Sequence, residues 1–446
     1  MSTRLFGTDG IRGRAGEPPL DRATVHRIGA ALIRALEPAE PCPQLVIGRD
    51  TRESGEWIER ELALGARQAG AEVRSVGVLP TPAVAYLART AGVSLAVVIS
   101  ASHNPYEDNG IKVFSGAGHK FTEAAERRVE AMVSDPSWRL DAAAVTEVPH
   151  VDLSARYLGH LREMLPDPGR LQGARLVVDC ANGATAPVAA RLFRSLGFDV
   201  TLVGVEPDGR NINLGCGSTH PERMAAETAR AGAVAGVAFD GDGDRAIFAD
   251  EQGAIVDGDA VMLMCARQMQ AEGRLRGNTV VATVMSNIGL EIALRASGIA
   301  LKRTQVGDKY VMEELLRDGF SIGGEQSGHI IFPDYLFTGD GLATALAVLR
   351  VMAVTGRPLS SLAGELVTYP QVLVNVKVRE RRDLSTMPDI REAMAGVEAR
   401  LSGQGRLLVR YSGTEPLLRI MLEGRHPEEI AAWANEIADA VRRELS

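Results

Sequence analysis

A serine loop and an aspartate loop are the segments of this chain best suited to chemistry. The first, Ile99-Ser-Ala-Ser-His-Asn-Pro105, places the Ser102 hydroxyl shortly after the apolar run 94–99. A loop at the carboxyl end of a buried strand is where open α/β sheets bind their ligands. Ser102 is therefore a candidate nucleophile, although a turn of this composition more often only satisfies its own backbone. The chain has no Gly-x-Ser-x-Gly segment, which argues against a hydrolase triad.

The second segment, Asp240-Gly-Asp-Gly-Asp-Arg245, alternates carboxylates with glycines after the apolar run 234–239. Asp240, Asp242 and Asp244 repel one another unless a cation lies among them, so the spacing predicts a divalent-cation site rather than an acidic surface turn. Ligands that are all oxygen favour Mg²⁺ held partly by a phosphate. An EF-hand loop is excluded because Arg245 stands where that loop needs glycine, and because the flanks have the composition of strands.

Two later segments offer groups that suit sugars and phosphates. Gly323-Gly-Glu-Gln-Ser-Gly-His329 supplies a carboxylate, a hydroxyl and an imidazole that could bind sugar hydroxyls, and a plain turn capped by His329 is an equal alternative. Arg410-Tyr-Ser-Gly-Thr-Glu-Pro416, with Arg419 downstream, combines guanidinium groups, hydroxyls and a glycine turn that could clamp a phosphate. A hairpin with solvated charges is the alternative there.

His103 and Lys112 follow Ser102 closely, and either could transfer protons if its surroundings brought its pKa toward neutrality. The residue types alone do not choose between them. A histidine in a loop is more often a structural hydrogen-bonding group, and a lysine more often a solvated charge.

The amino-acid composition excludes some classes of binding partner. The 446 residues include 49 Lys and Arg against 57 Asp and Glu, a net charge of -8, and only 4% aromatic residues, which argues against nucleic acid as a partner. No apolar stretch reaches the roughly 18 residues of a spanning helix, and the first residues have no signal-like apolar region, so we expect a cytoplasmic protein away from membranes. The widely spaced cysteines are predicted to be buried thiols in a reducing compartment: Cys42, Cys180, Cys216 and Cys265.

Three similar strand, loop and helix units position these groups. They begin at the apolar runs 45–50, 176–182 and 280–287, at domain-sized intervals. Beyond Pro370 the pattern changes to strands near 371–378, 407–409 and 418–422 with two helices, the last beginning at Pro427. The predicted domains are 1–150 with the serine loop, 151–254 with the aspartate loop, 255–369 with the sugar-binding loop, and 370–446 with the phosphate clamp.

Together, the serine loop, the aspartate loop, the Gly-Glu-x-Ser-Gly-His segment and the Arg-x-Ser-Gly-Thr-Glu-Pro segment resemble the α-D-phosphohexomutase superfamily over essentially the whole chain. The resemblance implies three tandem similar α/β/α domains with mixed sheets, plus a smaller C-terminal α+β domain, around a central cleft. The segments 5–13 and 100–105, with Gln326, resemble the bacterial branch that acts on amino-sugar phosphates rather than the hexose branch.

The same resemblance implies a role for each candidate residue. Ser102 would be phosphorylated and would bind one Mg²⁺ together with Asp240, Asp242 and Asp244. Catalytic side chains near the phosphoserine would be Arg12, His103, Lys112 and Arg245. Substrate would be bound by Gly307, Asp308, Glu325, Ser327 and His329, and its non-reacting phosphate by Arg410, Ser412, Gly413, Thr414 and Arg419.

The implied activity is that of an isomerase. It would interconvert glucosamine 6-phosphate and glucosamine 1-phosphate through a sugar 1,6-bisphosphate, which would also prime the serine, and would feed the synthesis of UDP-N-acetylglucosamine and cell-wall precursors. A homodimer is the implied assembly. Three alternatives stay open: a mutase for glucose or mannose phosphates, a metal-dependent phosphatase, and a non-catalytic sugar-phosphate sensor. A phosphatase would release inorganic phosphate stoichiometrically, and a sensor would not need a nucleophile beside a metal site.

Overall fold

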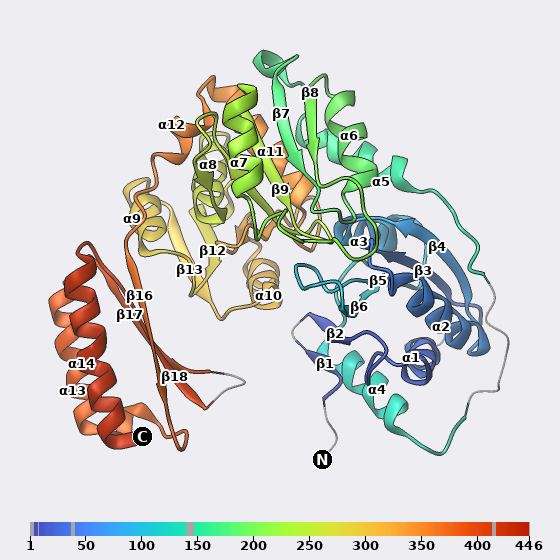
Figure 1. Cartoon of the computed structure of the whole chain (residues 1–446), viewed down its shortest axis with the longest axis horizontal. Helices are drawn as coiled ribbons and strands as arrows, with labels where there is room; N and C mark the ends of the chain where they lie inside the picture. Colours follow the sequence, from blue (N-terminus) through green and yellow to red (C-terminus); the bar gives the residue numbers. More distant parts are fainter. Residues whose placement is uncertain (1–3, 8, 37–40, 140–146, 413–415, 446) are drawn as a thin grey trace. The chain divides into compact units, whose positions relative to one another are not determined.

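The computed structural model describes residues 4–7, 9–36, 41–139, 147–412 and 416–445 (Figure 1). The chain forms two compact units: one holds residues 1–285 and 299–365, and the other holds residues 286–298 and 366–446. Within the described ranges, no helix is both long enough and apolar enough to cross a bilayer.

The first sheet carries the serine loop. Its six described strands follow the order β1-β2-β6-β5-β3-β4, and the sheet is mixed, because β3 pairs in parallel with β4 and β5 whereas β6 runs antiparallel to β5 and β2. Its elements are β1 (Phe6–Gly7), β2 (Gly10–Arg14), α1 (Arg22–Arg34), β3 (Gln44–Arg49), α2 (Gly55–Gln68), β4 (Glu72–Val78), α3 (Thr81–Thr90), β5 (Leu95–Ile99), β6 (Asp108–Ser115) and α4 (Glu123–Ser134).

Helices cover both faces of this sheet (Figure 1). Leu45 and Ile47 of β3 join the core that α1, α2 and α4 form on one face. On the other face a side chain at Gly48 would clash with Val84 of α3, so the helix lies directly against the strand. The central strands are thus buried on both sides, which explains why their sequences are continuous apolar runs.

The second sheet carries the aspartate loop, in the hairpin between β9 and β10. Its described strands follow the order β11-β10-β9-β7-β8, with β7 parallel to β8 and β9, and β10 antiparallel to β9. Helix α7 packs on it through Met224 and Ala225. Its elements are α5 (Ser154–Leu161), β7 (Arg175–Asp179), α6 (Ala186–Ser195), β8 (Asp199–Val203), α7 (Glu222–Ala231), β9 (Ala235–Phe239), β10 (Ala246–Ala249) and β11 (Ile255–Val256).

The third sheet carries the sugar-loop candidate between β14 and β15. Its described strands have the order β13-β12-β14-β15, again mixed, and α10 packs on it through Val311 and Leu315. Its elements are α8 (Gly258–Ala271), β12 (Thr279–Thr283), α9 (Ile288–Ala296), β13 (Ala300–Thr304), α10 (Asp308–Asp318), β14 (Gly323–Gly324), β15 (Ile330–Ile331), α11 (Gly341–Thr355) and α12 (Leu359–Ala363). Of these elements, α9 belongs to the second compact unit.

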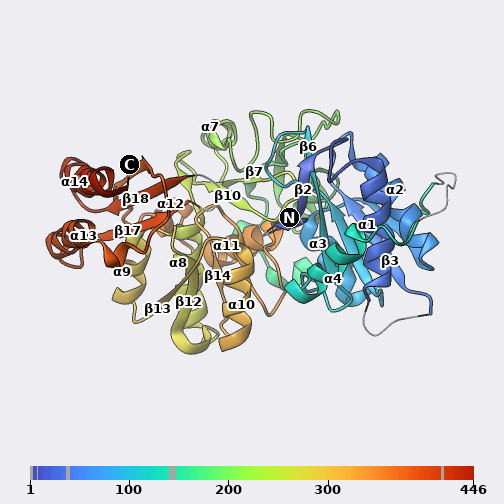
Figure 2. The same cartoon turned by 90° about the horizontal axis from the view of Figure 1, so that it is seen from below.

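The C-terminal sheet has the strand order β16-β18-β17 and is antiparallel within its described residues. Helices α13 and α14 lie on one side of it and share one apolar core with it (Figure 2). The elements are β16 (Gln371–Lys377), α13 (Pro388–Leu401), β17 (Arg406–Tyr411), β18 (Leu417–Glu423) and α14 (Pro427–Leu445). The predicted fold class, three α/β/α domains with mixed sheets plus a smaller α+β domain, is confirmed, whereas the predicted residue boundaries stay a prediction.

The prediction that every cysteine is buried is wrong at one position. Cys180, Cys216 and Cys265 are buried, but Cys42 is exposed. Cys42 stands between Pro41 and Pro43 just ahead of β3. Pro43 is already buried, and its carbonyl oxygen accepts a hydrogen bond from Glu72 N of β4, so Pro41 and Cys42 are the exposed residues before the sheet.

A pair of glycines controls the crossing of α1 and α2. A side chain at Gly65 would clash with the carbonyl oxygen of His26, and one at Gly29 with that of Leu62. We expect Gly65→Ala to lower the free energy of unfolding by about 2 kcal/mol, because the helices must move apart. Gly159→Ala is the matched control, since Gly159 lies exposed in α5 with open space around it, and alanine there should stabilise by about 0.5 kcal/mol. Denaturant unfolding compares them, and equal effects would contradict the packing argument.

The N-cap of α11 is a buried acid whose ionisation works against folding. Asp340 accepts hydrogen bonds from Ala343 N and Tyr157 Oη, both at 3.0 Å. Burial raises the pKa of Asp340 from 3.8 to about 6. A raised carboxyl pKa gives stability that is present below about pH 4 and is lost as the pH rises through about 6. We therefore expect Asp340→Asn to gain up to about 3 kcal/mol on the wild type between pH 4 and pH 7. Unfolding curves with parallel pH profiles would refute this.

Candidate functional site

Ser102 faces the aspartate loop directly. It follows β5 in the first sheet, its side chain is buried, and its Oγ donates a hydrogen bond to Asp240 Oδ2 at 2.5 Å. Its backbone has φ +53°, a left-handed conformation that residues other than glycine rarely adopt. Two loops that follow strands of different sheets therefore meet at one hydroxyl, although 138 positions separate them in sequence.

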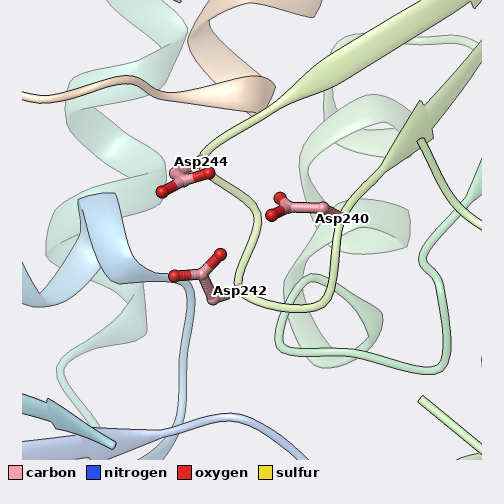
Figure 3. Close-up of side chains that lie close together, drawn as sticks. All are labelled: Asp240, Asp242 and Asp244. Atoms are coloured by element: carbon pink, nitrogen blue, oxygen red, sulfur yellow. The ribbon is translucent and has the colours of Figure 1, made fainter. Parts of the chain in front are cut away.

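The three aspartates form a group that could hold a cation. One oxygen atom from each of Asp240, Asp242 and Asp244 lies within 4.8 Å of the others, and Figure 3 shows the carboxylates facing a shared space. Asp242 Oδ1 and Asp244 Oδ1 are buried without a hydrogen-bond partner. Burial, followed by the charges of Asp244 and Asp242, raises the pKa of Asp240 well above its usual value. Unpartnered buried oxygens and mutual repulsion are what a divalent cation would relieve, so these residues fit a metal.

Glycines allow the aspartate loop to approach its neighbours. A Cβ at Gly241 would lie 2.6 Å from Ser102 O, and Gly243 has φ +74° with Thr185 2.6 Å from where its Cβ would be. Thr81, at the start of α3, donates from its amide to Asp242 O at 2.8 Å and from its hydroxyl to the Asp242 carboxylate at 2.5 Å. Ser102, after β5, and Thr81, at the start of α3, thus both hold the loop.

Lys112 compensates the acidic group. Its Nζ lies 2.8 Å from Asp242, 2.9 Å from Asp9 and 3.3 Å from Asp244. Burial by itself lowers the pKa of Lys112, but Asp242, Asp9 and Asp244 together raise it well above its usual value. Lys112 is therefore a fixed positive charge beside the predicted metal ligands.

Asp9 and Lys120 complete the charge network, and residue patterns alone did not identify either of them. Lys120 bridges Asp9, at 2.6 Å, and Asp308, at the start of α10. Asp9 also pairs with Arg12 at 2.6 Å. In the sequence, Asp9 is marked only by its place near Arg12 in the opening segment. Lys120 is an isolated lysine after Gly118-His119, and no motif around it indicates a functional residue.

A cavity of about 530 Å³ opens onto this network. Cationic and imidazole groups on its wall come from Arg12, His103 and Arg245, and carboxylates from Asp308 and Glu325. The remaining lining residues are Arg4, Leu5, Phe6, Gly7, Asp9, Gly10, Asp244, Val306, Gly307 and His329. Positive and negative groups on one wall suit a ligand that has both a phosphate and hydroxyl or amino groups.

His103, on the wall of the cavity, contacts the serine hydroxyl: its Nδ1 lies 3.4 Å from Ser102 Oγ. Burial, followed by the positive charges of Arg245 and Arg12, lowers the pKa of His103 to about 4. The imidazole is therefore neutral near pH 7. A neutral ring at this distance can accept a proton.

The sugar-loop candidate reaches the same cavity. Glu325 accepts a hydrogen bond from Gly307 N at 3.2 Å, which joins two of the predicted binding segments. His329 Nε2 lies 3.1 Å from Gly339 N, and its Nδ1 lies 3.5 Å from Asp244 Oδ1. Burial by itself lowers the pKa of His329, but the carboxylates of Asp244 and Asp308 raise it to about 9. Ser327 is exposed and is not among the residues that line the cavity, so its part in sugar binding stays a prediction.

Gln326 has a structural partner. Its Nε2 donates to Asp257, the N-cap of α8, at 3.0 Å, and its carbonyl oxygen accepts from Gly258 N at 3.0 Å. A Cβ at Gly258 would clash with Glu325 O, so the loop lies flat against the helix start. Gln326 therefore fixes the turn that presents Glu325.

The predicted phosphate-clamp residues belong to the second unit. Arg410 of β17 pairs in register with Arg419 of β18, so the two guanidinium groups stand on the same face of the sheet. Ser412 is buried and its carbonyl oxygen accepts a hydrogen bond from Arg381 at 2.6 Å. Gly413 and Thr414 lie outside the described residues.

The chain matches the models of four protein domains in sequence order. They are the phosphoglucomutase/phosphomannomutase alpha/beta/alpha domain I over residues 3–139, domain II over 155–253, domain III over 257–369, and the C-terminal domain over 373–440.

Relatives and solved structures agree with these matches. The chain is 48% identical to a phosphoglucosamine mutase of Solibacter usitatus over all of both chains. It resembles the crystal structure of a phosphoglucomutase/phosphomannomutase family protein from Burkholderia thailandensis, with a TM-score of 0.80 and 25% identity over 99% of this chain and 98% of that one. It shares the fold of an N-acetylphosphoglucosamine mutase from Aspergillus fumigatus, solved with GlcNAc-6P and magnesium, with a TM-score of 0.67 and 19% identity over 98% and 95% of the two chains.

Removing the Lys112 charge should expose the repulsion within the site. We expect Lys112→Met to lower the free energy of unfolding by about 3 kcal/mol in a chelator, because buried carboxylates lose their counter-charge. Added Mg²⁺ should recover much of this loss if the aspartates bind it. The matched control is Lys309→Met, whose partner Glu123 is half exposed, and it should leave stability nearly unchanged. Chemical unfolding with EDTA and with Mg²⁺ measures both, and equal effects of the two variants would contradict the role of Lys112.

Proposed function

The chain belongs to the phosphoglucomutase/phosphomannomutase family, and we propose that it interconverts glucosamine 6-phosphate and glucosamine 1-phosphate. It is an isomerase of the phosphohexomutase type. The observation that carries the mechanism is the buried Ser102 hydroxyl facing three clustered aspartates, beside a cavity lined with both cations and carboxylates. The amino-sugar substrate rests on full-length relatives that bear the name phosphoglucosamine mutase.

Ser102 is the residue that carries the phosphoryl group. Asp240, Asp242 and Asp244, with the phosphorylated Ser102, would hold one Mg²⁺, which supplies positive charge to the transferring group when bound. Lys112, Arg12 and Arg245 supply further positive charge. Their fixed positions mean that little reorganisation is needed when charge develops on the phosphoryl oxygens.

Turnover consists of two transfers. In the first, the O1 hydroxyl of glucosamine 6-phosphate attacks the phosphorus on Ser102, the bond from phosphorus to Oγ breaks, and the hydroxyl proton passes to a side chain of the site. The product is the 1,6-bisphosphate, which turns in the cavity. In the second, Ser102 Oγ attacks the phosphorus of the 6-phosphate, the bond from phosphorus to O6 breaks, O6 takes up the proton, and glucosamine 1-phosphate leaves. His103 is the side chain that we assign to proton transfer, since its neutral ring lies beside Oγ. Lys112, which the aspartates hold in its charged form, is assigned to charge neutralisation.

Substrate recognition is divided between several segments. Gly307, Asp308, Glu325, Ser327 and His329 are assigned to the sugar, and the guanidinium pair of Arg410 and Arg419, with Ser412, Gly413 and Thr414, to the non-reacting phosphate. A sugar 1,6-bisphosphate would prime the serine, and one solved relative holds glucose 1,6-bisphosphate. The assembly assigned to the chain is a homodimer.

The substrate is tested by a coupled assay with Mg²⁺ and a trace of sugar 1,6-bisphosphate. We expect turnover of glucosamine 6-phosphate to exceed that of glucose 6-phosphate and mannose 6-phosphate at least tenfold in kcat/KM. Equal or faster hexose turnover would move the chain to the hexose branch of the same family. Stoichiometric release of inorganic phosphate would instead indicate a phosphatase.

The nucleophile is tested by Ser102→Ala. We expect at least a thousandfold loss of mutase activity with unchanged folding, because the phosphoryl group then has no acceptor on the protein. Intact mass should show one added phosphate on the wild type after incubation with the bisphosphate, and none on the variant. Ser327→Ala is the matched control, since it removes an exposed hydroxyl assigned only to binding, and its phosphate uptake should persist. Retained turnover in Ser102→Ala would refute the mechanism.

A further inference from the structure

Arg52 is a fully buried cation that touches neither the cavity nor the aspartate loop in any described contact. It lies in the segment that follows β3, and its side chain has no exposed surface. Its guanidinium group donates to three carbonyl oxygens of the serine loop: to Ser102 O and Asn104 O, both at 2.9 Å, and to Pro105 O at a shorter distance. One side chain thus holds the backbone of the serine and of two residues that follow it.

A second set of contacts ties this clamp to the amide of the serine. Arg52 Nε donates to Asp50 Oδ2 at 2.9 Å, and the same carboxylate oxygen accepts the Ser100 hydroxyl at 2.5 Å. The Ser100 Oγ in turn accepts the Ser102 amide at 2.9 Å. The amide and the carbonyl of Ser102 are therefore both held from the end of β3, through Asp50 and Arg52.

Asn213, in the segment that follows β8, adds two hydrogen bonds to the backbone of the serine loop. Asn213 Nδ2 donates to Ser102 O at 3.0 Å and to Asn104 O at 3.3 Å, the same two carbonyls that Arg52 binds. These contacts surround a serine whose φ is +53°. A left-handed residue with a side chain persists only where its surroundings over-determine it. Here three hydrogen bonds fix the amide and the carbonyl of Ser102, and three more fix the carbonyls of Asn104 and Pro105.

We propose that Arg52 is a positioning residue for phosphoryl transfer: it holds Ser102 in the left-handed conformation that aims Oγ at Asp240. The inference rests on the proposed role of Ser102 as the phosphoryl carrier. Reacting groups must be held within about half an ångström of their productive positions, and a planar guanidinium fork fixes several carbonyls at once in a way that an ammonium group does not. Because Arg52 does not line the cavity, it should affect the transfer and leave substrate affinity unchanged.

The test compares Arg52→Lys with the wild type. Lysine keeps a positive charge for Asp50 but cannot reach all the carbonyls. We expect kcat to fall about 30-fold with KM changed less than about twofold, because a small misplacement of a reacting group costs up to about a hundredfold in rate. The rate at which glucose 1,6-bisphosphate phosphorylates Ser102, followed by intact mass in single turnover, should fall by the same factor.

Two further variants separate positioning from general stability. Ile28→Val removes a methyl group from the buried core of the same domain and none of the hydrogen bonds that hold the serine loop, so it should leave the phosphorylation rate unchanged. Asn213→Ala leaves Arg52 intact and removes the contact from the second sheet, so it should slow phosphorylation by about threefold to tenfold even if Arg52→Lys folds poorly.

The outcomes are distinguishable. A wild type that takes up no phosphate on Ser102 would refute the proposed function, and this inference with it. A wild type that takes up phosphate, with Arg52→Lys or Asn213→Ala equally fast, would overturn the inference alone. A parallel rise in KM, or an equal loss in Ile28→Val, would also overturn it, because either result would show a general structural effect.

Discussion

The mutual repulsion of three buried carboxylates is the constraint on which the rest of the site depends. Asp240, Asp242 and Asp244 cannot all be ionised beside one another without nearby positive charge. Lys112 supplies part of it from the first sheet, and a bound cation would supply the rest. The first two sheets must therefore be joined before the site exists, since the carboxylates come from one and the lysine from the other. The attraction between Lys112 and the aspartates therefore favours the packing of domain I against domain II.

The backbone serves the same need. Glycines in the aspartate loop let it approach Ser102 O and Thr185 at distances that a Cβ would not allow. Opposite these glycines, Ser102 has a left-handed backbone conformation that glycine adopts most readily. Glycine could not supply the hydroxyl at this position, and the hydrogen bonds to the Ser102 amide and carbonyl hold the conformation. The serine loop thus contains the strained residue, Ser102, and the aspartate loop contains the conformationally permissive residues, Gly241 and Gly243. Buried hydrogen bonds from Arg52 and Asn213 fix the strained side.

Local sequence predicted the strands, the helices after them and the loops between them, because continuous apolar runs and glycine-rich turns determine these within a few residues. It also predicted that Ser102 and the aspartates each lie in a loop that follows a buried strand. That the two loops meet was implied by the family resemblance alone. It did not predict Lys120 or Asp9, because the ion pairs that join them to each other, to Lys112 and to Asp308 span more than a hundred residues and leave no spacing to detect. Ser327 was assigned by its motif, but exposure depends on how the turn packs against α8. Cys42 was misassigned because burial was inferred from residue type and spacing, whereas its exposure follows from its place just ahead of β3.

A phosphoserine can be hydrolysed by water instead of passing its phosphoryl group to a sugar. The structure limits access of water to Ser102 even without substrate. The Ser102 side chain is 1% exposed, and its oxygen is already engaged by Asp240. In the proposed reaction, a hydroxyl group of a bound sugar would approach the phosphorus from the cavity, whose wall includes Arg12, Arg245 and Glu325, whereas a water molecule would lack the rest of the sugar to hold it in line. Transfer to sugar would then exceed transfer to water through positioning rather than through intrinsic reactivity, because the two oxygens are chemically alike. The rigid hold on the serine loop and the polar wall of the cavity are therefore two parts of one requirement, which is to let only an oriented hydroxyl react.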